Sequence, residues 1–175
     1  MKNCKVKAVI LIPLVVLLFT VCSSIPKPSS PDSTLLVIPV TKDQVQTDLG
    51  GLEFWLYLED GSKHRVDFSG SENLAFITGL EAGKLETRFL RANLDPRYSS
   101  SSGKRNWDYP LRVSSEVIPG RYTILPVIFV YREVKEREAN ISFSIDFVKI
   151  TPQDRSRILY KLEEMGIDDY WDAAE

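Results

Sequence analysis

Hydrophobic and polar residues alternate along most of the chain. The clearest example is the stretch 140–150, whose apolar residues at alternate positions are Ile141, Phe143, Ile145 and Phe147. Successive side chains of a strand point to opposite faces of a sheet, so this pattern predicts a strand with one buried face. Alternation predicts strands at 52–58 and 63–68 as well, and a short apolar run rich in β-branched residues predicts one at 34–40. Further strands are expected at 74–78, 84–91, 111–117 and 121–132.

The dipeptide Asp60-Gly61 separates two of these stretches and is typical of a tight turn between antiparallel strands. It predicts a hairpin of 52–58 and 63–68. Seven or eight short strands with Gly and Pro between them predict a mainly β protein. We expect a single antiparallel β-sandwich domain over residues 34–150.

The pattern changes at Thr151, where an N-cap, a proline and an acidic residue follow one another. Apolar residues then recur at helical spacing, and Gly166 suits a C-terminal cap. We therefore predict a C-terminal α-helix over 151–166 that covers an edge or face of the sandwich. Trp55 and Tyr57 face away from the best apolar face, which places them beneath this helix or, as the less favoured alternative, exposed. Residues 167–175 are expected to form a solvated acidic tail.

The first 21 residues have the organisation of a secretory signal peptide. Lys2, Lys5 and Lys7 precede an apolar run at 8–19, which is shorter than the about 20 residues that a transmembrane helix needs. The run leads into Leu18-Phe19-Thr20-Val21-Cys22, which resembles the lipobox of bacterial lipoproteins. Phe19 and Val21 depart from the usual residues of that motif. The resemblance implies a signal peptide at 1–21 and lipid attachment, with palmitate among the acyl groups, at Cys22.

Two other interpretations of the N-terminus stay open. Ordinary signal-peptidase cleavage after Ser23 would give a soluble secreted protein, and an uncleaved transmembrane anchor is the weaker alternative. Cys22 is the only cysteine after the signal, so an intramolecular disulfide is excluded for the mature chain. Residues 22–33 are rich in Ser and Pro, which predicts an extended tether roughly 30 Å long.

Charge excludes one class of partner. Three of the 22 basic residues lie in the predicted signal and none of the 24 acidic residues does, so the mature chain has a net charge of −5. A nucleic-acid-binding surface needs a basic balance, so we expect no nucleic-acid partner.

The sequence has few of the groups that catalysis needs. His64 is the only histidine, and its place in a strand favours a half-buried structural role. No Gly-x-Ser-x-Gly elbow, phosphate-binding glycine loop or metal-ligand spacing is present. We expect no enzymatic activity, no cofactor and no metal.

The long polar segment 92–110 is the candidate binding loop. Its candidate binding residues are of the types that dominate interfaces, namely Arg97, Tyr98, Arg105, Trp107 and Tyr109. The competing interpretation is that Trp107 and Tyr109 begin the next strand and pack on the core or its rim. An alternative function is carbohydrate binding, with Trp107, Tyr109 and Trp55 stacking on sugar rings.

One short pattern occurs twice. Leu80-Glu81-Ala82-Gly83-Lys84-Leu85 and Val117-Ile118-Pro119-Gly120-Arg121-Tyr122 share an apolar residue, two others, Gly, a basic residue and an apolar residue. Gly supplies a positive φ at a turn, and a strand is expected just after it. The pattern resembles the turn-to-strand entry of transthyretin-like and carboxypeptidase-regulatory-like sandwich domains of envelope proteins. That resemblance implies an immunoglobulin-like or transthyretin-like sandwich.

Together these features predict a lipoprotein of the bacterial cell envelope, anchored at the outer membrane or at the periplasmic face of a membrane. We expect a structural or protein-interaction module with the bilayer and an envelope protein as partners. A glycan ligand and a secreted protein are the alternatives.

Overall fold

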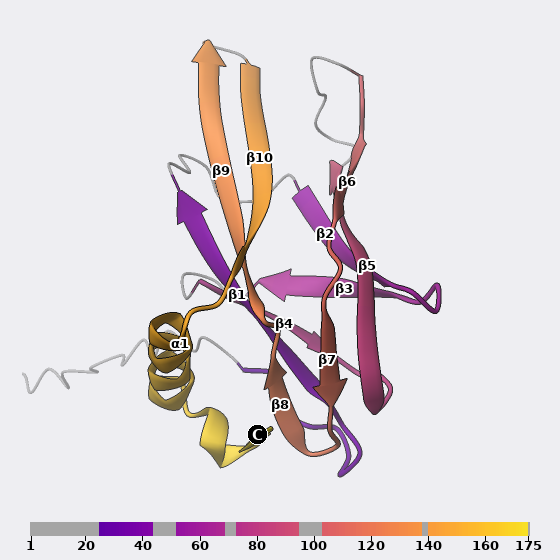
Figure 1. Cartoon of the computed structure of the whole chain (residues 1–175), viewed down its shortest axis with the longest axis vertical. Coiled ribbons are helices and arrows are strands. Elements are labelled where there is room, and N and C mark those ends of the chain that lie inside the picture. Colours follow the sequence, from indigo (N-terminus) through magenta and orange to yellow (C-terminus); the bar gives the residue numbers. More distant parts are fainter. Residues whose placement is uncertain (1–24, 44–51, 69–72, 95–102, 138–139, 175) are drawn as a thin grey trace, which may run out of the picture.

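The computed structural model describes residues 25–43, 52–68, 73–94, 103–137 and 140–174 (Figure 1). These residues form eleven strands, one α-helix and one 3₁₀ helix. The strands are β1 (Leu35–Asp43), β2 (Leu52–Leu58), β3 (Lys63–Phe68), β4 (Leu74–Thr78), β5 (Gly83–Leu94), β6 (Asn106–Pro110), β7 (Ser114–Val117), β8 (Arg121–Ile124), β9 (Val127–Arg137), β10 (Asn140–Lys149) and β11 (Asp172–Ala173). The helices are α1 (Pro152–Glu164) and η1 (Ile167–Asp169). The predicted mainly β class and the C-terminal helix are confirmed.

The strands follow one path through the sheet, β10-β9-β1-β4-β3-β2-β5-β6, and the sheet curls until it is nearly closed into a barrel. The expectation of purely antiparallel pairing is wrong at three places, because β1 pairs in parallel with β8 and with β9, and β8 pairs in parallel with β11. The predicted strand 121–132 is two strands. Pro126 has no backbone N–H to donate and interrupts the ladder between them.

Local signals in the sequence are confirmed where the turn or cap is made by neighbouring residues. Gly61 has a φ of 87° in the turn of the β2–β3 hairpin, and Phe54 pairs with Val66. Thr151 and Asp154 form the reciprocal hydrogen bonds of a capping box at the start of α1. The glycines of the repeated pattern, Gly83 and Gly120, both have positive φ, and a strand begins at or just after each of them.

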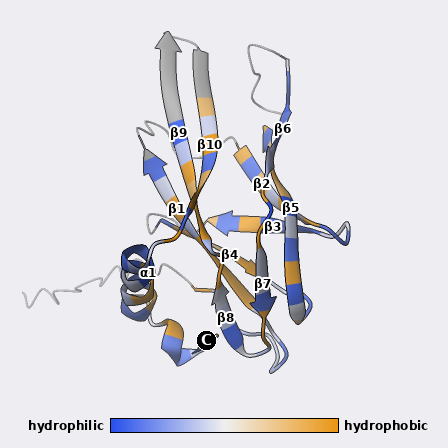
Figure 2. Ribbon diagram, viewed as in Figure 1, coloured by the Kyte–Doolittle hydropathy of each residue, from blue (hydrophilic) through white to orange (hydrophobic). Residues whose placement is uncertain are grey.

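Strands β1 and β4 are buried on both faces. One face of β1 contributes Leu36 and Ile38 to the main core inside the barrel, and the other contributes Leu35 and Val37 to a second core outside it. Figure 2 shows the resulting concentration of hydrophobic residues on these two central strands. This explains why their sequences are nearly continuous apolar runs, in contrast to the alternating strands around them.

The second core lies between the outer face of β1, β4 and β8 and the C-terminal elements. Its members include Phe76 and Tyr122 from the sheet, Ile158 and Leu162 from α1, and Ile167, Trp171 and Ile25 from the two ends of the described chain. Helix α1 therefore covers a face of the sheet, as expected. It does not cover Trp55 and Tyr57, which lie half-buried on β2 away from this core, so the favoured expectation that they lie beneath the helix is wrong.

Two segments predicted to be solvated are docked on the domain. Ile25 is 6% exposed, the carbonyl oxygen of Pro26 accepts a hydrogen bond of 2.7 Å from Trp171 Nε1, and Gly120 N donates to the carbonyl oxygen of Ser33 at 2.8 Å. Within the predicted tether 22–33, the described part from Ile25 onward is thus not a free spacer. The predicted acidic tail is also held, because Ile167 and Trp171 are buried and β11 pairs with β8.

The hydrogen bond between Trp171 and Pro26 gives a direct test of this docking. Trp171→Phe removes the indole donor and keeps an aromatic ring, so we expect a loss of about 1–2 kcal/mol in the free energy of unfolding. Tyr170→Phe is the matched control, because Tyr170 is 41% exposed, and it should change stability by less than about 0.5 kcal/mol. Urea denaturation measures both. Equal effects of the two substitutions would contradict the docking.

Candidate functional site

The predicted site residues are only partly placed by the structure. Cys22, Arg97 and Tyr98 lie outside the described residues. Arg105 is exposed just before β6, and Trp107 and Tyr109 lie on β6 itself. The segment 92–110 is therefore not all loop. β5 extends to Leu94 and β6 returns beside it, with Ala92 opposite Trp107.

Trp107 and Tyr109 point toward the inside of the barrel. Trp107 packs edge to face against Phe143 of β10, with 5.0 Å between the ring centroids, and Tyr109 packs on the main core. Burial raises the pKa of the Tyr109 phenol to about 12. Both residues therefore lie on a strand, with Tyr109 on the core and Trp107 at its rim, as the second interpretation expected.

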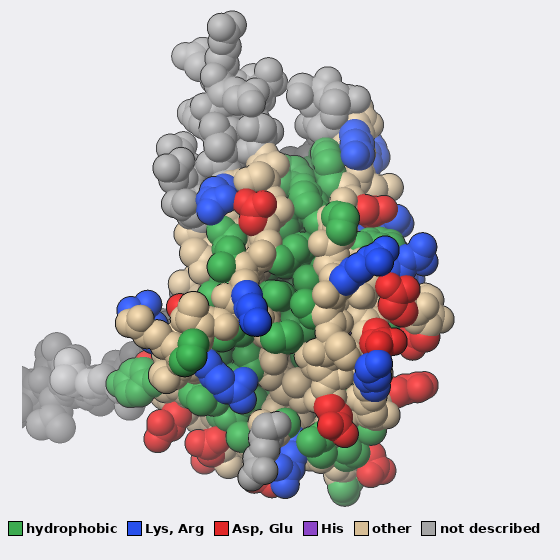
Figure 3. Space-filling view, in the orientation of Figure 1, with side chains coloured by type: hydrophobic (Ala, Val, Ile, Leu, Met, Phe, Trp, Pro, Cys, Tyr) green, Lys and Arg blue, Asp and Glu red, His purple; other side chains and the backbone are tan. Residues whose placement is uncertain are grey.

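The contact between Trp107 and Phe143 joins the two ends of the sheet. β6 and β10 lie at opposite ends of the strand path, and side chains rather than backbone hydrogen bonds bridge them. We call the two strand edges, together with the side chains of Trp107, Tyr109, Phe143 and Phe147, the β6–β10 seam. Figure 3 shows hydrophobic side chains gathering in a band between these two strands.

The backbone groups along the edge of β6 follow from its pairing with β5. Leu94 N donates to the carbonyl oxygen of Arg105 at 2.8 Å, which places residues 105, 107 and 109 in the hydrogen-bonded pairs of the antiparallel ladder. The N–H and C=O groups of Asn106 and Asp108 therefore point away from β5, toward the seam. In the described part of the chain no strand pairs with this edge.

The edge of β10 has the same character. Ile150 N donates to the carbonyl oxygen of Pro126 at 3.2 Å, so the even-numbered residues of β10 pair with β9. The backbone groups of Phe143, Ile145 and Phe147 consequently face the seam. β6 and β10 run in the same direction, because each pairing along the strand path is antiparallel except that of β1 with β9.

Strands β7 and β8 close the seam at the end below β6 and β10 in Figure 1. The chain passes from β7 to β8 through a short turn, and Thr123 Oγ1 donates to the carbonyl oxygen of Glu116 at 2.8 Å.

Inside the barrel, a pocket lined by apolar residues including Leu56, Leu90 and Phe129 has a volume of about 10 Å³. That volume suits about one water molecule, so this pocket does not hold a larger ligand.

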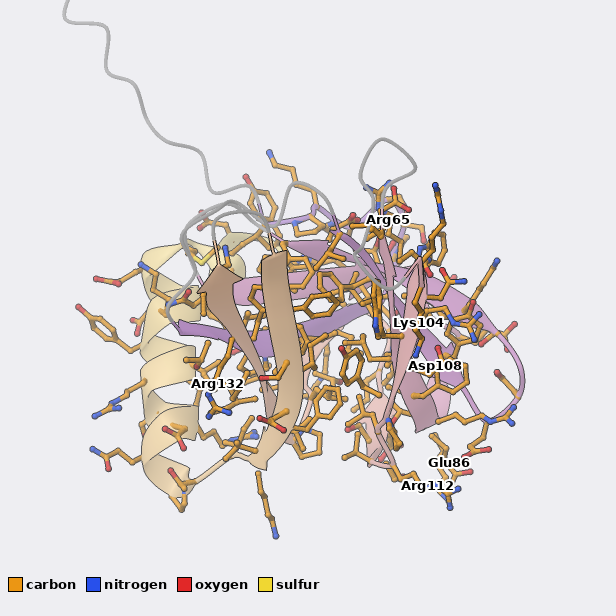
Figure 4. All side chains as sticks on the ribbon, turned by 90° about the horizontal axis from the view of Figure 1, so that it is seen from above. Arg65, Glu86, Lys104, Asp108, Arg112 and Arg132 are labelled. Carbon is orange, nitrogen blue, oxygen red and sulfur yellow. The ribbon has the colours of Figure 1, made fainter. Side chains whose placement is uncertain are left out.

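A second group of side chains covers the outer face of β2, β5 and β6. Arg91 donates through Nε and Nη2 to the two carboxylate oxygens of Asp108, at 2.6 and 2.8 Å. Its guanidinium also lies 5.0 Å from the ring centroid of Tyr57, which stacks on Phe89 at 4.5 Å. These hydrogen bonds lower the pKa of Asp108 and raise that of Arg91. Figure 4 shows Asp108 and Lys104 on this side of the barrel, with Arg132 on the opposite side.

Sequence reasoning missed this outer group because Trp55 and Tyr57 were expected beneath α1. The available signal was the spacing of Phe89 and Arg91, which puts both on one face of a strand. The arrangement also contradicts the proposed sugar-stacking platform. Trp55 is paired with Arg91 on the outer face, whereas Trp107 and Tyr109 face inward, so the three rings share no surface.

Other chemistry receives no support from the described residues. They contain no group of three or more His, Cys, Asp or Glu side chains arranged to hold a metal ion. His64 lies half-buried in β3 opposite Leu56. No helix in the described ranges is long and apolar enough to cross a bilayer.

The ion pair of Arg91 and Asp108 predicts a pH dependence of stability. Since the folded-state pKa of Asp108 is lowered, its contribution is present above about pH 4, the usual carboxyl value. It is lost as the pH falls through the lower folded-state pKa. Asp108→Asn should therefore cost up to about 1 kcal/mol at pH 7 and progressively less below pH 4.

The measurement is urea denaturation of both proteins at several pH values. Asp67→Asn is the control, because it removes a carboxylate 3.5 Å from Arg65 in a more exposed pair, and it should cost less than about 0.5 kcal/mol at pH 7. A cost for Asp108→Asn that does not diminish at low pH would show that the ion pair is not its source.

The chain matches no family model, no curated protein sequence and no solved structure.

Proposed function

We propose that this chain is a non-catalytic lipoprotein of the bacterial envelope whose barrel binds an extended segment of another envelope protein at the β6–β10 seam. The observation that carries the proposal is the pair of strand edges that no other strand of the described residues pairs with. They run in one direction and flank a row of aromatic side chains. Exposed edges of this kind accept an added strand unless they are covered.

The geometry favours an extended polypeptide as the ligand. Asn106 and Asp108 on one edge, and Phe143 and Ile145 on the other, direct backbone donors and acceptors toward the seam. A strand antiparallel to β6 would also be antiparallel to β10, so either edge would pair with it in the same orientation. Alternate side chains of that strand would contact Trp107.

The membrane anchor in this proposal is an acyl modification of Cys22. Its support is the basic, apolar and lipobox-like order of residues 1–22. Several acyl chains on one residue would give stable attachment, whereas one chain gives marginal binding. Cleavage after Ser23 with secretion is the alternative that the anchor test decides.

We also propose a fold type, in which the barrel is a curled form of the transthyretin-like sandwich. The support is the repeated turn-to-strand pattern, whose two copies are neighbours in the sheet because Gly83 of one pairs with Val117 of the other.

The edge of β6 can be tested by removing one backbone donor. The N–H of Asn106 faces the seam, so Asn106→Pro removes it without breaking a bond to β5, a position where edge strands accept proline. Co-purification of partners with the full chain from its native envelope should fall at least tenfold. Asn106→Thr keeps the N–H and is the matched control. Equal recovery with both variants would contradict binding at this edge.

The anchor has a separate test. Cys22→Ala removes the only thiol of the mature chain and should abolish incorporation of labelled palmitate. The protein should then move from the membrane fraction to the soluble fraction. Retention of Cys22→Ala in membranes, with no loss of label, would contradict lipid attachment at this residue.

A further inference from the structure

The described chain enters the domain very close to the predicted acylation site. Ile25 is buried in the second core, and Pro26 and Ser33 are hydrogen-bonded to Trp171 and Gly120. Residues 25–33 are therefore held on the domain at both ends, so they do not increase the distance between the domain and a lipid attached at Cys22. Only Ser23 and Ser24 separate Cys22 from Ile25. Three peptide units span at most about 11 Å.

The elements around this entry point share a surface character. The large hydrophobic residues that are most exposed in the described chain are Val148 at 49%, Tyr160 at 62% and Tyr170 at 41%. They lie at the end of β10, on α1 and just after η1, which are adjacent in sequence. The α1 and η1 elements pack around Ile25 in the second core. Lys27 Nζ lies 4.6 Å from the ring centroid of Tyr170.

These residue types suit the headgroup layer of a bilayer. Tyrosine rings are enriched at membrane interfaces, and lysine extends its ammonium group toward the phosphates while its apolar stem stays buried. Helix α1 carries both signs of charge, with Arg155, Arg157, Lys161, Glu163 and Glu164 in its sequence and Lys161 Nζ 3.6 Å from Glu164 Oε2.

We propose that the docked segment 25–33 acts as a clasp that holds the α1–η1 face against the lipid surface, with Tyr160 and Tyr170 at the headgroups. This inference rests on the proposed lipid anchor at Cys22. A free spacer of the length of 22–33 would let the domain turn in any direction. The clasp instead fixes which face meets the bilayer and leaves the β2–β3 turn on the side opposite α1 (Figure 1).

The test uses the acylated full chain, purified from its native envelope and placed in phosphatidylcholine vesicles. With Cys22 acylated, one added cysteine can carry an environment-sensitive fluorophore. Ser156→Cys is exposed on α1, one turn from Tyr160 on the same helix face, and Glu59→Cys is the control in the β2–β3 turn. Lipids with a nitroxide near the headgroup should quench the label at 156 at least twofold more than the label at 59.

A second variant tests the short reach itself. Ten Gly and Ser residues inserted between Ser24 and Ile25 leave the docked segment unchanged and lengthen only the connection. Quenching at 156 should then fall toward the value at 59, since a longer linker lowers the effective concentration of the face at the membrane.

The outcomes separate this inference from the anchor on which it rests. Vesicle binding with palmitate incorporated, but equal quenching at 156 and 59, would overturn the clasp and leave the anchor intact. Quenching that the insertion does not change would overturn it as well. Vesicle binding by Cys22→Ala would instead overturn the anchor.

Discussion

The burial of β1 and β4 on both faces is the constraint on which the rest of the molecule depends. One face of each strand completes the interior of the barrel, and the other needs a cover of its own. Each side chain such as Phe76 or Leu35 contributes on the order of 1.5–3 kcal/mol when fully buried. The two ends of the described chain supply that cover, so Ile25, α1 and Trp171 lie on the same surface.

This arrangement divides the molecule into a closed side and an open side. On the closed side, the second core fastens the N-terminal segment, the C-terminal segment and β8 together. On the open side, β6 and β10 approach without pairing, and Trp107 with Phe143 fills the space between them. The barrel is therefore joined at one end, and its two terminal strand edges lie side by side along the seam.

In the proposed function, the anchor and the seam are linked through the same fold, because the short connection from Cys22 to Ile25 places the closed side at the membrane. The side-chain cluster of Arg91, Asp108, Tyr57 and Phe89 lies outside both regions and connects β2, β5 and β6. We infer that its role is to stabilise this part of the sheet, which includes the β6 edge of the seam.

The sequence by itself determined the mainly β class, the β2–β3 hairpin and the capped helix α1, because a turn, a cap and an alternation are each made by residues close together in the chain. It also determined that Trp107 and Tyr109 had two candidate roles. Only the tertiary structure showed where their rings pack, and it alone revealed the parallel neighbours of β1, the docking of Ile25 and Trp171, and the outer position of Trp55. A period of two shows that a strand has two faces. It carries no information about which distant strand, helix or chain end lies against each face, since that depends on contacts between residues far apart in sequence.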